Sequence, residues 1–145
     1  MLNEQQEAAM SRISFTVLGR PAPQGSLKAF ISHGQARVKS DNAATMPWRQ
    51  QVGWTALNAR PTADVWAARH EAVSIAITFV FSKPTSVPKK RLHMAVKPDL
   101  DKLCRSVLDA LSGILFFDDG QVIQITAGKM YGLPERAEIT LEALK

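Results

Sequence analysis

Regular alternation of apolar and polar residues marks the β-strands of this chain. It is clearest over residues 72–81, where every second position holds a large apolar residue: Val73, Ile75, Ile77, Phe79 and Phe81. A two-residue period predicts a strand with one buried face, and we expect this strand at the centre of a sheet. Shorter runs predict strands at residues 13–18, 121–130 and 137–143, and a hairpin over residues 29–38 with an exposed His33 in its turn.

A period of 3.6 residues predicts two helices. The first has Pro47 in its first turn and runs to about Arg60, where Pro61 ends it. The second covers residues 100–111, and its apolar stripe consists of Leu100, Leu103, Cys104, Val107, Leu108 and Leu111. Gly113 follows at the position where chains commonly leave a helix in a left-handed conformation. The order of elements indicates an α+β (mixed α/β) fold, with a mixed β-sheet of about four to five strands packed against two main helices.

Length and composition limit the class of protein. The 145 residues, 46% of them hydrophobic, fit a single domain over residues 1–145, in which residues 1–10 form a flexible or short helical lead. Uncharged runs are too short to span a bilayer and the N-terminus lacks a secretory pattern, so we expect a cytoplasmic protein with no membrane contact. The single cysteine, Cys104, is interpreted as a buried, inert thiol. No glycine-rich phosphate-binding motif is present, so no nucleotide cofactor is predicted, and the histidines lack zinc-ligand spacing.

The positive charge is concentrated in two segments without acidic residues. The net charge is +5, and ten of the eighteen Lys and Arg residues lie in residues 8–40 and 72–98. The second segment contains Lys89, Lys90, Arg91 and Lys97 and leads directly into an acidic pair. A polyanion bound there would place a phosphate beside those acids, although a solvated lysine-rich loop explains the same pattern. The basic residues of the hairpin are also candidates for DNA contact.

Four aspartates bracket the second helix, Asp99 and Asp101 at its start and Asp118 and Asp119 after its end. Each pair has an ordinary explanation: Asp99 as a helix cap with Asp101 in the first turn, and Asp118-Asp119-Gly120 as a turn. Together, four carboxylates around one short helix repel each other unless a cation or a shared proton relieves them. Carboxylate oxygens suit Mg²⁺, with Mn²⁺ as a substitute.

The motif KPDLDxLxxxxLDALxG, followed by DDxQVxxxxxxK, spans about Lys97 to Lys129 and resembles the RusA family of Holliday junction resolvases. The resemblance implies that Asp99, Asp101 and Asp119 are the catalytic, metal-binding aspartates, with Asp118 as a further metal neighbour. It also implies a homodimer that makes paired nicks across a four-way DNA junction, in a phage or prophage setting. Two positions depart from the family pattern, since Lys102 replaces an asparagine and Arg105 a lysine. Arginine keeps the charge and grips phosphate, but it does not donate a proton at neutral pH.

The acidic cluster predicts metal-dependent hydrolysis of a phosphodiester, and the resemblance implies an Mg²⁺-dependent, structure-specific endodeoxyribonuclease that resolves Holliday junctions in DNA recombination and repair. Arg105 joins the three aspartates as a catalytic candidate, and the predicted DNA-binding residues are Lys89, Lys90, Arg91, Lys97, Lys102 and Lys129. Lys129 is equally explained as an edge lysine that extends to solvent. Two alternatives are a metal-dependent nuclease for flaps or other branched DNA and a branched-DNA-binding protein that does not cut. Candidates for the dimer surface are Trp48, Trp54 and residues 114–117.

Overall fold

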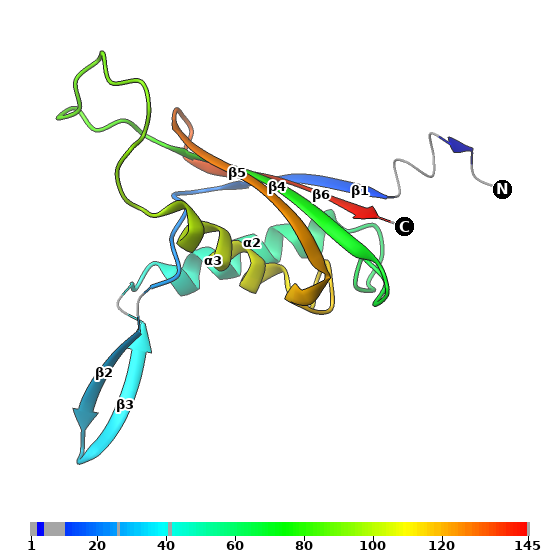
Figure 1. Cartoon of the computed structure of the whole chain (residues 1–145), viewed down its shortest axis with the longest axis horizontal. Coiled ribbons are helices and arrows are strands. Elements are labelled where there is room, and N and C mark those ends of the chain that lie inside the picture. The colour runs from blue at the N-terminus through cyan, green and yellow to red at the C-terminus, as the bar shows by residue number, and fades with distance from the viewer. Residues whose placement is uncertain (1–2, 5–10, 26, 41, 145) are drawn as a thin grey trace.

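The computed structural model describes residues 3–4, 11–25, 27–40 and 42–144, which form six strands and two α-helices (Figure 1). Their order is β1 (Arg12–Leu18), β2 (Leu27–Ser32), β3 (Gln35–Ser40), α2 (Thr45–Ala59), β4 (Ala72–Phe81), α3 (Leu100–Leu111), β5 (Val122–Tyr131) and β6 (Arg136–Leu144). A short 3₁₀ turn, Asp119–Gln121, precedes β5. Each strand and helix predicted above is present. The lead predicted over residues 1–10 falls, apart from Asn3 and Glu4, outside the described residues.

Four strands form one mixed sheet in the order β1-β6-β4-β5. β6 pairs antiparallel with both β1 and β4, whereas β4 and β5 run parallel. Parallel neighbours need a crossover connection, and α3 provides it between β4 and β5. β4 therefore lies inside the sheet, as predicted, and β5 forms one edge. The predicted α+β domain with a mixed sheet and two main helices is confirmed.

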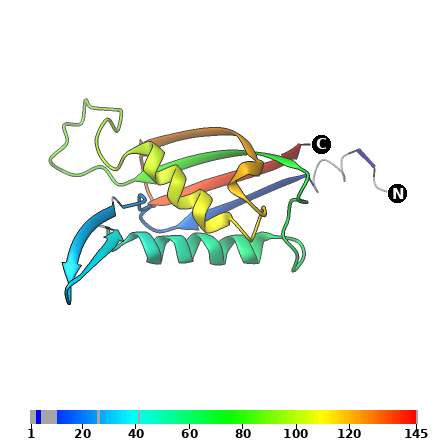
Figure 2. The same cartoon turned by 60° about the horizontal axis from the view of Figure 1, so that its bottom comes forward.

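Both helices cover the same face of the sheet (Figure 2). The alternating apolar residues of β4 form part of the core beneath them, and each is at most 2% exposed: Val73, Ile75, Ile77, Phe79 and Phe81. α3 adds Leu103, Val107 and Leu111 to this core, and burying each such side chain stabilises the fold by about 1.5–3 kcal/mol. The apolar stripe thus fixes α3 against the sheet and determines where the residues at its two ends lie.

α2 separates its two tryptophans. Trp48, Val52 and Ala56 are buried against the core, whereas Trp54 is 65% exposed. The helix ends as the sequence predicts, because Arg60 takes an extended conformation before Pro61. Trp48 is consequently a core residue, and only Trp54 of the two is available to a partner.

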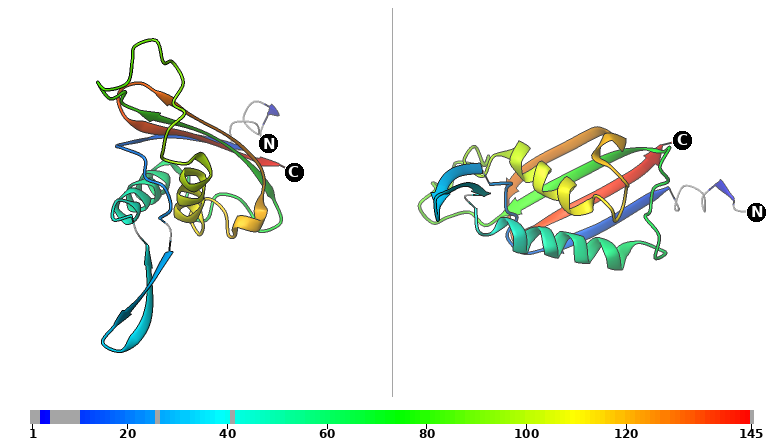
Figure 3. Two further views of the ribbon diagram at one scale, coloured as in Figure 1. Left: turned by 60° about the vertical axis from the view of Figure 1, so that its left-hand side comes forward. Right: turned by 90° about the horizontal axis from the view of Figure 1, so that it is seen from below.

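β2 and β3 form a second, two-stranded sheet that projects away from the rest of the domain (Figure 1; Figure 3, left). The two strands are joined at His33 and Gly34, which have φ values of 52° and 76°. Two successive residues with positive φ are the geometry of a tight hairpin turn. His33 is exposed there, as predicted. Among the described residues, none of the helices is long and apolar enough to cross a membrane.

Candidate active site

Asp99 and Asp101 lie at the start of α3, but only Asp101 belongs to the helix. Asp99 is the residue before the helix, in an extended conformation with φ −69° and ψ 133°. Asp99 occupies the N-cap position, but its side chain makes no capping hydrogen bond. Asp101 is exposed in the first turn. Neither carboxylate is used to close the helix end, and both are available for other chemistry.

Lys129 holds the segment that leads into α3. Its ammonium group donates hydrogen bonds to the backbone carbonyls of Val96 and Pro98, the latter at 2.8 Å. These contacts tie β5 to the residues immediately before Asp99. Two of the three N–H donors of Lys129 are therefore used inside the protein. A DNA contact through Lys129 stays a prediction, but the side chain is more than an edge lysine extended to solvent.

The turn that carries the second acidic pair is held by the side-chain amide of Gln121. The Gln121 Oε1 atom accepts hydrogen bonds from the backbone N–H groups of Phe117 (2.7 Å) and Asp118 (3.3 Å). Its Nε2 atom donates to the carbonyls of Ala68 (2.8 Å) and Glu71 (2.9 Å). Gln121 thus fastens the acidic turn to a distant segment before β4. The sequence analysis did not select this residue.

Asp118 and Asp119 have different surroundings in that turn. The Asp118 carboxylate accepts a hydrogen bond from the backbone N–H of Gly120 at 3.3 Å and forms a reciprocal capping box with Gln121. The ordinary turn role therefore describes Asp118 well. Asp119 follows as the first residue of the 3₁₀ turn, and its carboxylate is not part of this capping box. A metal-binding role for Asp118 stays a prediction.

A cavity of about 630 Å³ between α3, β5 and the acidic turn brings several predicted site residues together. Asp101, Arg105 and Asp119 line it, together with Asp109. Asp101, Arg105 and Asp109 are spaced four residues apart, so they follow one face of the helix. Asp109 was not among the predicted site residues, although its i+8 spacing from Asp101 was a usable signal. The rest of the lining is mainly apolar: Leu100, Cys104, Leu108, Ile125 and Ala127.

Among the carboxylates of this cavity, Asp119 has a shifted pKa. The pKa of Asp119 is raised by partial burial and then by the negative charges of Asp109 and Asp118. Asp101 does not contribute to this shift, because it lies at the other end of α3. The pKa of the Cys104 thiol is also raised, by burial and then by the charge of Asp101, which agrees with the predicted inert thiol.

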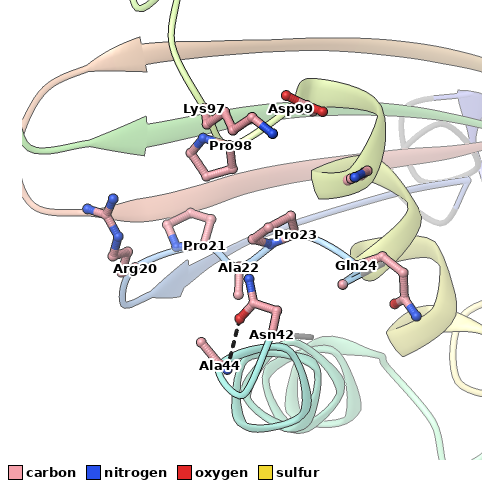
Figure 4. Close-up of a pocket in the computed structure, with 12 residues that line it drawn as sticks. Arg20, Pro21, Ala22, Pro23, Gln24, Asn42, Ala44, Lys97, Pro98 and Asp99 are labelled. Atoms are coloured by element: carbon pink, nitrogen blue, oxygen red, sulfur yellow. Dashed lines mark hydrogen bonds between the residues drawn. The ribbon is translucent and has the colours of Figure 1, made fainter. Parts of the chain in front are cut away.

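Asp99 lines a different cavity, of about 500 Å³, on the side of α3 that faces the start of α2 (Figure 4). Basic side chains share its lining, including Arg20, Lys97 and Lys102. Arg20 is also paired with Glu135 at 2.7 Å. Asp99 therefore does not line the cavity of Asp101 and Asp119. A metal-binding role for Asp99 stays a prediction.

Within the described part of the chain, no three Asp, Glu, His or Cys residues are arranged to hold a single metal ion. Asp101 and Asp109 are eight helical residues apart, which is about 12 Å along the axis. The chemistry of the donors nevertheless fits Mg²⁺, because that ion is often bound by one or two carboxylates with water and substrate phosphate. The carboxylates of one chain are therefore the right kind of ligand for Mg²⁺, but among the described residues no three of them are close enough to bind the same ion.

The predicted basic loop lies between β4 and α3. Lys89, Lys90, Arg91 and Lys97 are all exposed in it. Its shape is held by Lys83, whose ammonium donates to the carbonyls of Lys89 (3.2 Å) and Arg91 (2.6 Å). This loop and the β2–β3 hairpin project from the same end of the molecule, on either side of the start of α3 (Figures 1 and 3). Asp99 and Asp101 thus lie between two basic projections.

Comparison with known proteins gives two matches. A family model described as endodeoxyribonuclease RusA matches residues 20–142, from the loop after β1 to the last strand. An uncharacterized protein, YqaN of Bacillus subtilis (strain 168), is 29% identical over 138 residues, which cover 91% of this chain and 96% of that protein. The family match includes both cavities, the hairpin and the acidic turn.

Proposed function

This chain belongs to the RusA family of endodeoxyribonucleases, and from that premise we propose that it resolves four-way DNA junctions by paired, metal-dependent nicks. Membership of the family makes it an enzyme that hydrolyses DNA. The observation that carries the proposal is the cavity whose walls include Asp101, Arg105, Asp109 and Asp119. Carboxylates whose charges raise a neighbour's pKa are relieved by a divalent cation.

Mg²⁺ is the proposed cofactor, held by Asp101 and Asp119 with Asp99 as a further ligand. When bound, it activates water and neutralises charge that develops on the phosphate. Arg105 lies one turn after Asp101 on the same wall and binds a phosphate oxygen through its planar guanidinium group. Because this group stays charged at neutral pH, Arg105 stabilises negative charge and transfers no proton. Lys97 and Lys102, beside Asp99 in the neighbouring cavity, would guide the adjoining part of the strand.

The separation of the acids within one chain supports a homodimer. Asp99 and Asp101 lie at the start of α3, whereas Asp109 lies near its other end, where its charge raises the pKa of Asp119. A two-fold dimer that sets the start of one α3 beside the end of the partner helix would unite Asp101 with Asp119 of the other chain. Two-fold symmetry then gives two equivalent sites, as paired cuts in a symmetric junction require. Of the predicted surface residues, Trp54 and Phe117 are exposed enough to take part, whereas Trp48 is in the core.

The first experiment incubates the protein with an end-labelled mobile four-way junction in Mg²⁺, Mn²⁺ or EDTA. We expect symmetric nicks with either metal and none with chelator. Flap DNA and linear duplex are the comparison substrates. Equal cutting of flaps would favour a general branched-DNA nuclease, and tight junction binding without nicks in either metal would identify a binding protein that does not cut.

The shared site has its own test in mixed dimers. Asp101→Asn and Asp119→Asn proteins are each expected to be inactive, and they are then mixed after dissociation. If two chains build each site, a mixed dimer contains one intact site and one with both changes. About a quarter of the normal number of active sites should return by statistical exchange, and they should make single rather than paired nicks. No recovery would show that each site is built within one chain, without affecting the nuclease assignment.

A further inference from the structure

The β2–β3 hairpin pairs with no other strand of the described chain. It follows the loop after β1, precedes α2, and points away from the four-stranded sheet and both helices (Figure 1; Figure 3, left). An isolated two-stranded sheet is marginally stable in water. A hairpin of this kind gains stability from contact with something outside the domain core.

Apolar and basic residues are exposed together along this hairpin. Ile31 is 81% exposed and Phe30 is 38% exposed, and Arg37 is exposed opposite Phe30. The strand register also places Lys28 opposite Lys39. Like charges at directly opposed positions destabilise a strand pair, and an anion beside them removes that cost. No acidic residue occurs anywhere in residues 8–40 to provide it.

The root of the hairpin adjoins the candidate active site. Gly25 and Asn42 flank the hairpin, and both line the cavity that contains Asp99, Lys97 and Lys102 (Figure 4). The basic loop of Lys89 to Arg91 projects from the same end of the molecule on the other side of α3 (Figure 3). A strand that reaches Asp99 and Asp101 would therefore continue into a duplex that passes along the hairpin.

We propose that the β2–β3 hairpin is a DNA-binding arm that lies along the duplex next to the cleaved strand. This inference rests on the proposed function and specifies which part of the protein binds the junction arm. A two-stranded β-ribbon fits the major groove. Arg37 supplies a contact to a phosphate, which fixes position without reading sequence, and Lys28 and Lys39 add two further positive charges to the hairpin. Phe30, which is opposite Arg37 on the same face of the ribbon, meets base edges, where apolar side chains contact thymine methyl groups.

The test measures binding alone, in EDTA, so that it does not depend on cleavage. The dissociation constant for a four-way junction is determined over a range of salt concentrations for wild type, Arg37→Ala and a matched control, Arg12→Ala. Arg12 is an exposed arginine paired with Glu142 at the far end of β1, so both variants lose one positive charge. We expect Arg37→Ala to bind about 3- to 10-fold more weakly and to lose about 0.9 from the slope of log affinity against log salt. Arg12→Ala should match wild type in both.

A triple variant, Lys28→Ala with Arg37→Ala and Lys39→Ala, strengthens the test. Its salt slope should fall by about 2.7, while its melting temperature stays near that of wild type because the hairpin is outside the core. Equal effects of Arg37→Ala and Arg12→Ala on junction affinity, or an unchanged salt slope in the triple variant, would refute the proposal that the hairpin binds DNA. So would a change in oligomeric state with unchanged DNA affinity, which would make the hairpin a contact between copies of the chain. Absence of junction binding by wild type would instead reject the proposed function.

Discussion

The four hydrogen bonds of the Gln121 amide make the stability of the acidic turn measurable. Gln121→Ala removes the two bonds to the N–H groups of Phe117 and Asp118 and the two bonds to the carbonyls of Ala68 and Glu71. A neutral hydrogen bond contributes about 1 kcal/mol net. Water replaces part of this at the two exposed N–H groups, so we expect a loss of about 2–3 kcal/mol in the free energy of unfolding.

The corresponding fall in melting temperature is about 6–12 °C for a domain of this size. Urea unfolding of the metal-free protein, followed by tryptophan fluorescence, gives the free energy directly. Gln124→Ala is the matched control, because Gln124 is an exposed glutamine three residues further on, in β5, and should change stability by no more than about 0.5 kcal/mol. A Gln121→Ala protein as stable as the control would refute the idea that this amide holds the turn.

A second substitution separates the two halves of the amide. Gln121→Glu keeps an acceptor for Phe117 and Asp118 but cannot donate to the carbonyls of Ala68 and Glu71. It should therefore be at least as destabilising as Gln121→Ala at neutral pH, because a carboxylate then faces two carbonyl oxygens. Junction cleavage should fall more than junction binding in both variants, since the turn carries Asp119. Equal losses in cleavage and binding would indicate a general effect on folding.

Further substitutions test the other parts of the site. Asp101→Asn should abolish cutting and preserve or strengthen junction binding, because it removes a repulsive charge; cutting at the native rate would show that the metal site is misassigned. Lys129→Ala should lower the free energy of unfolding by about 1–3 kcal/mol and raise the Mg²⁺ concentration needed for cleavage, with partial rescue by Lys129→Arg; an unchanged metal requirement would limit Lys129 to stability. Arg105→Lys should leave the cleavage rate unchanged if the residue supplies only charge, and a rise would reveal a proton-transfer role. Asp109→Asn should lower the raised pKa of Asp119, measured by NMR titration of the metal-free protein. A carboxyl with a raised pKa costs stability as the pH rises through that pKa, so this variant should lose less stability than wild type as the pH rises through the pKa of Asp119. An unchanged pKa of Asp119 would contradict the assigned effect of Asp109.

The elements of this fold were predictable wherever a long apolar pattern was present. β4 and α3 carry uninterrupted periods of two and 3.6 residues, and both were found at the expected residues. In α2 the same period places Trp48, Val52, Ala56 and Ala59 on one stripe and leaves Trp54 outside it. The first three are buried and Trp54 is exposed, but Ala59 at the helix end is exposed as well.

The acids show the limit of sequence reasoning more clearly. The sequence offered Asp99 as a helix cap and Asp118 as part of a turn, but only the Asp118 side chain makes a capping hydrogen bond in the structure. The difference depends on Gln121, whose carbonyl partners are 50 and 53 residues away in the chain. The spacing of Asp109 from Asp101 indicates a shared helix face, but its approach to Asp119 depends on how the chain returns from α3 to the acidic turn. Such contacts between distant segments have no local signature.

Two lysines of the domain hold backbone segments in place through hydrogen bonds to carbonyl groups. Lys83 and Lys129 each bind two backbone carbonyls, and together they secure the long segment between β4 and α3 near its beginning and its end. These contacts join an ammonium group to neutral carbonyl oxygens at hydrogen-bond distance, so dissolved ions weaken them far less than they weaken long-range attraction between exposed charges. Salt that strips DNA from the protein should leave this segment in its native shape. The enzyme would then be released from DNA with its basic loop already formed for the next encounter.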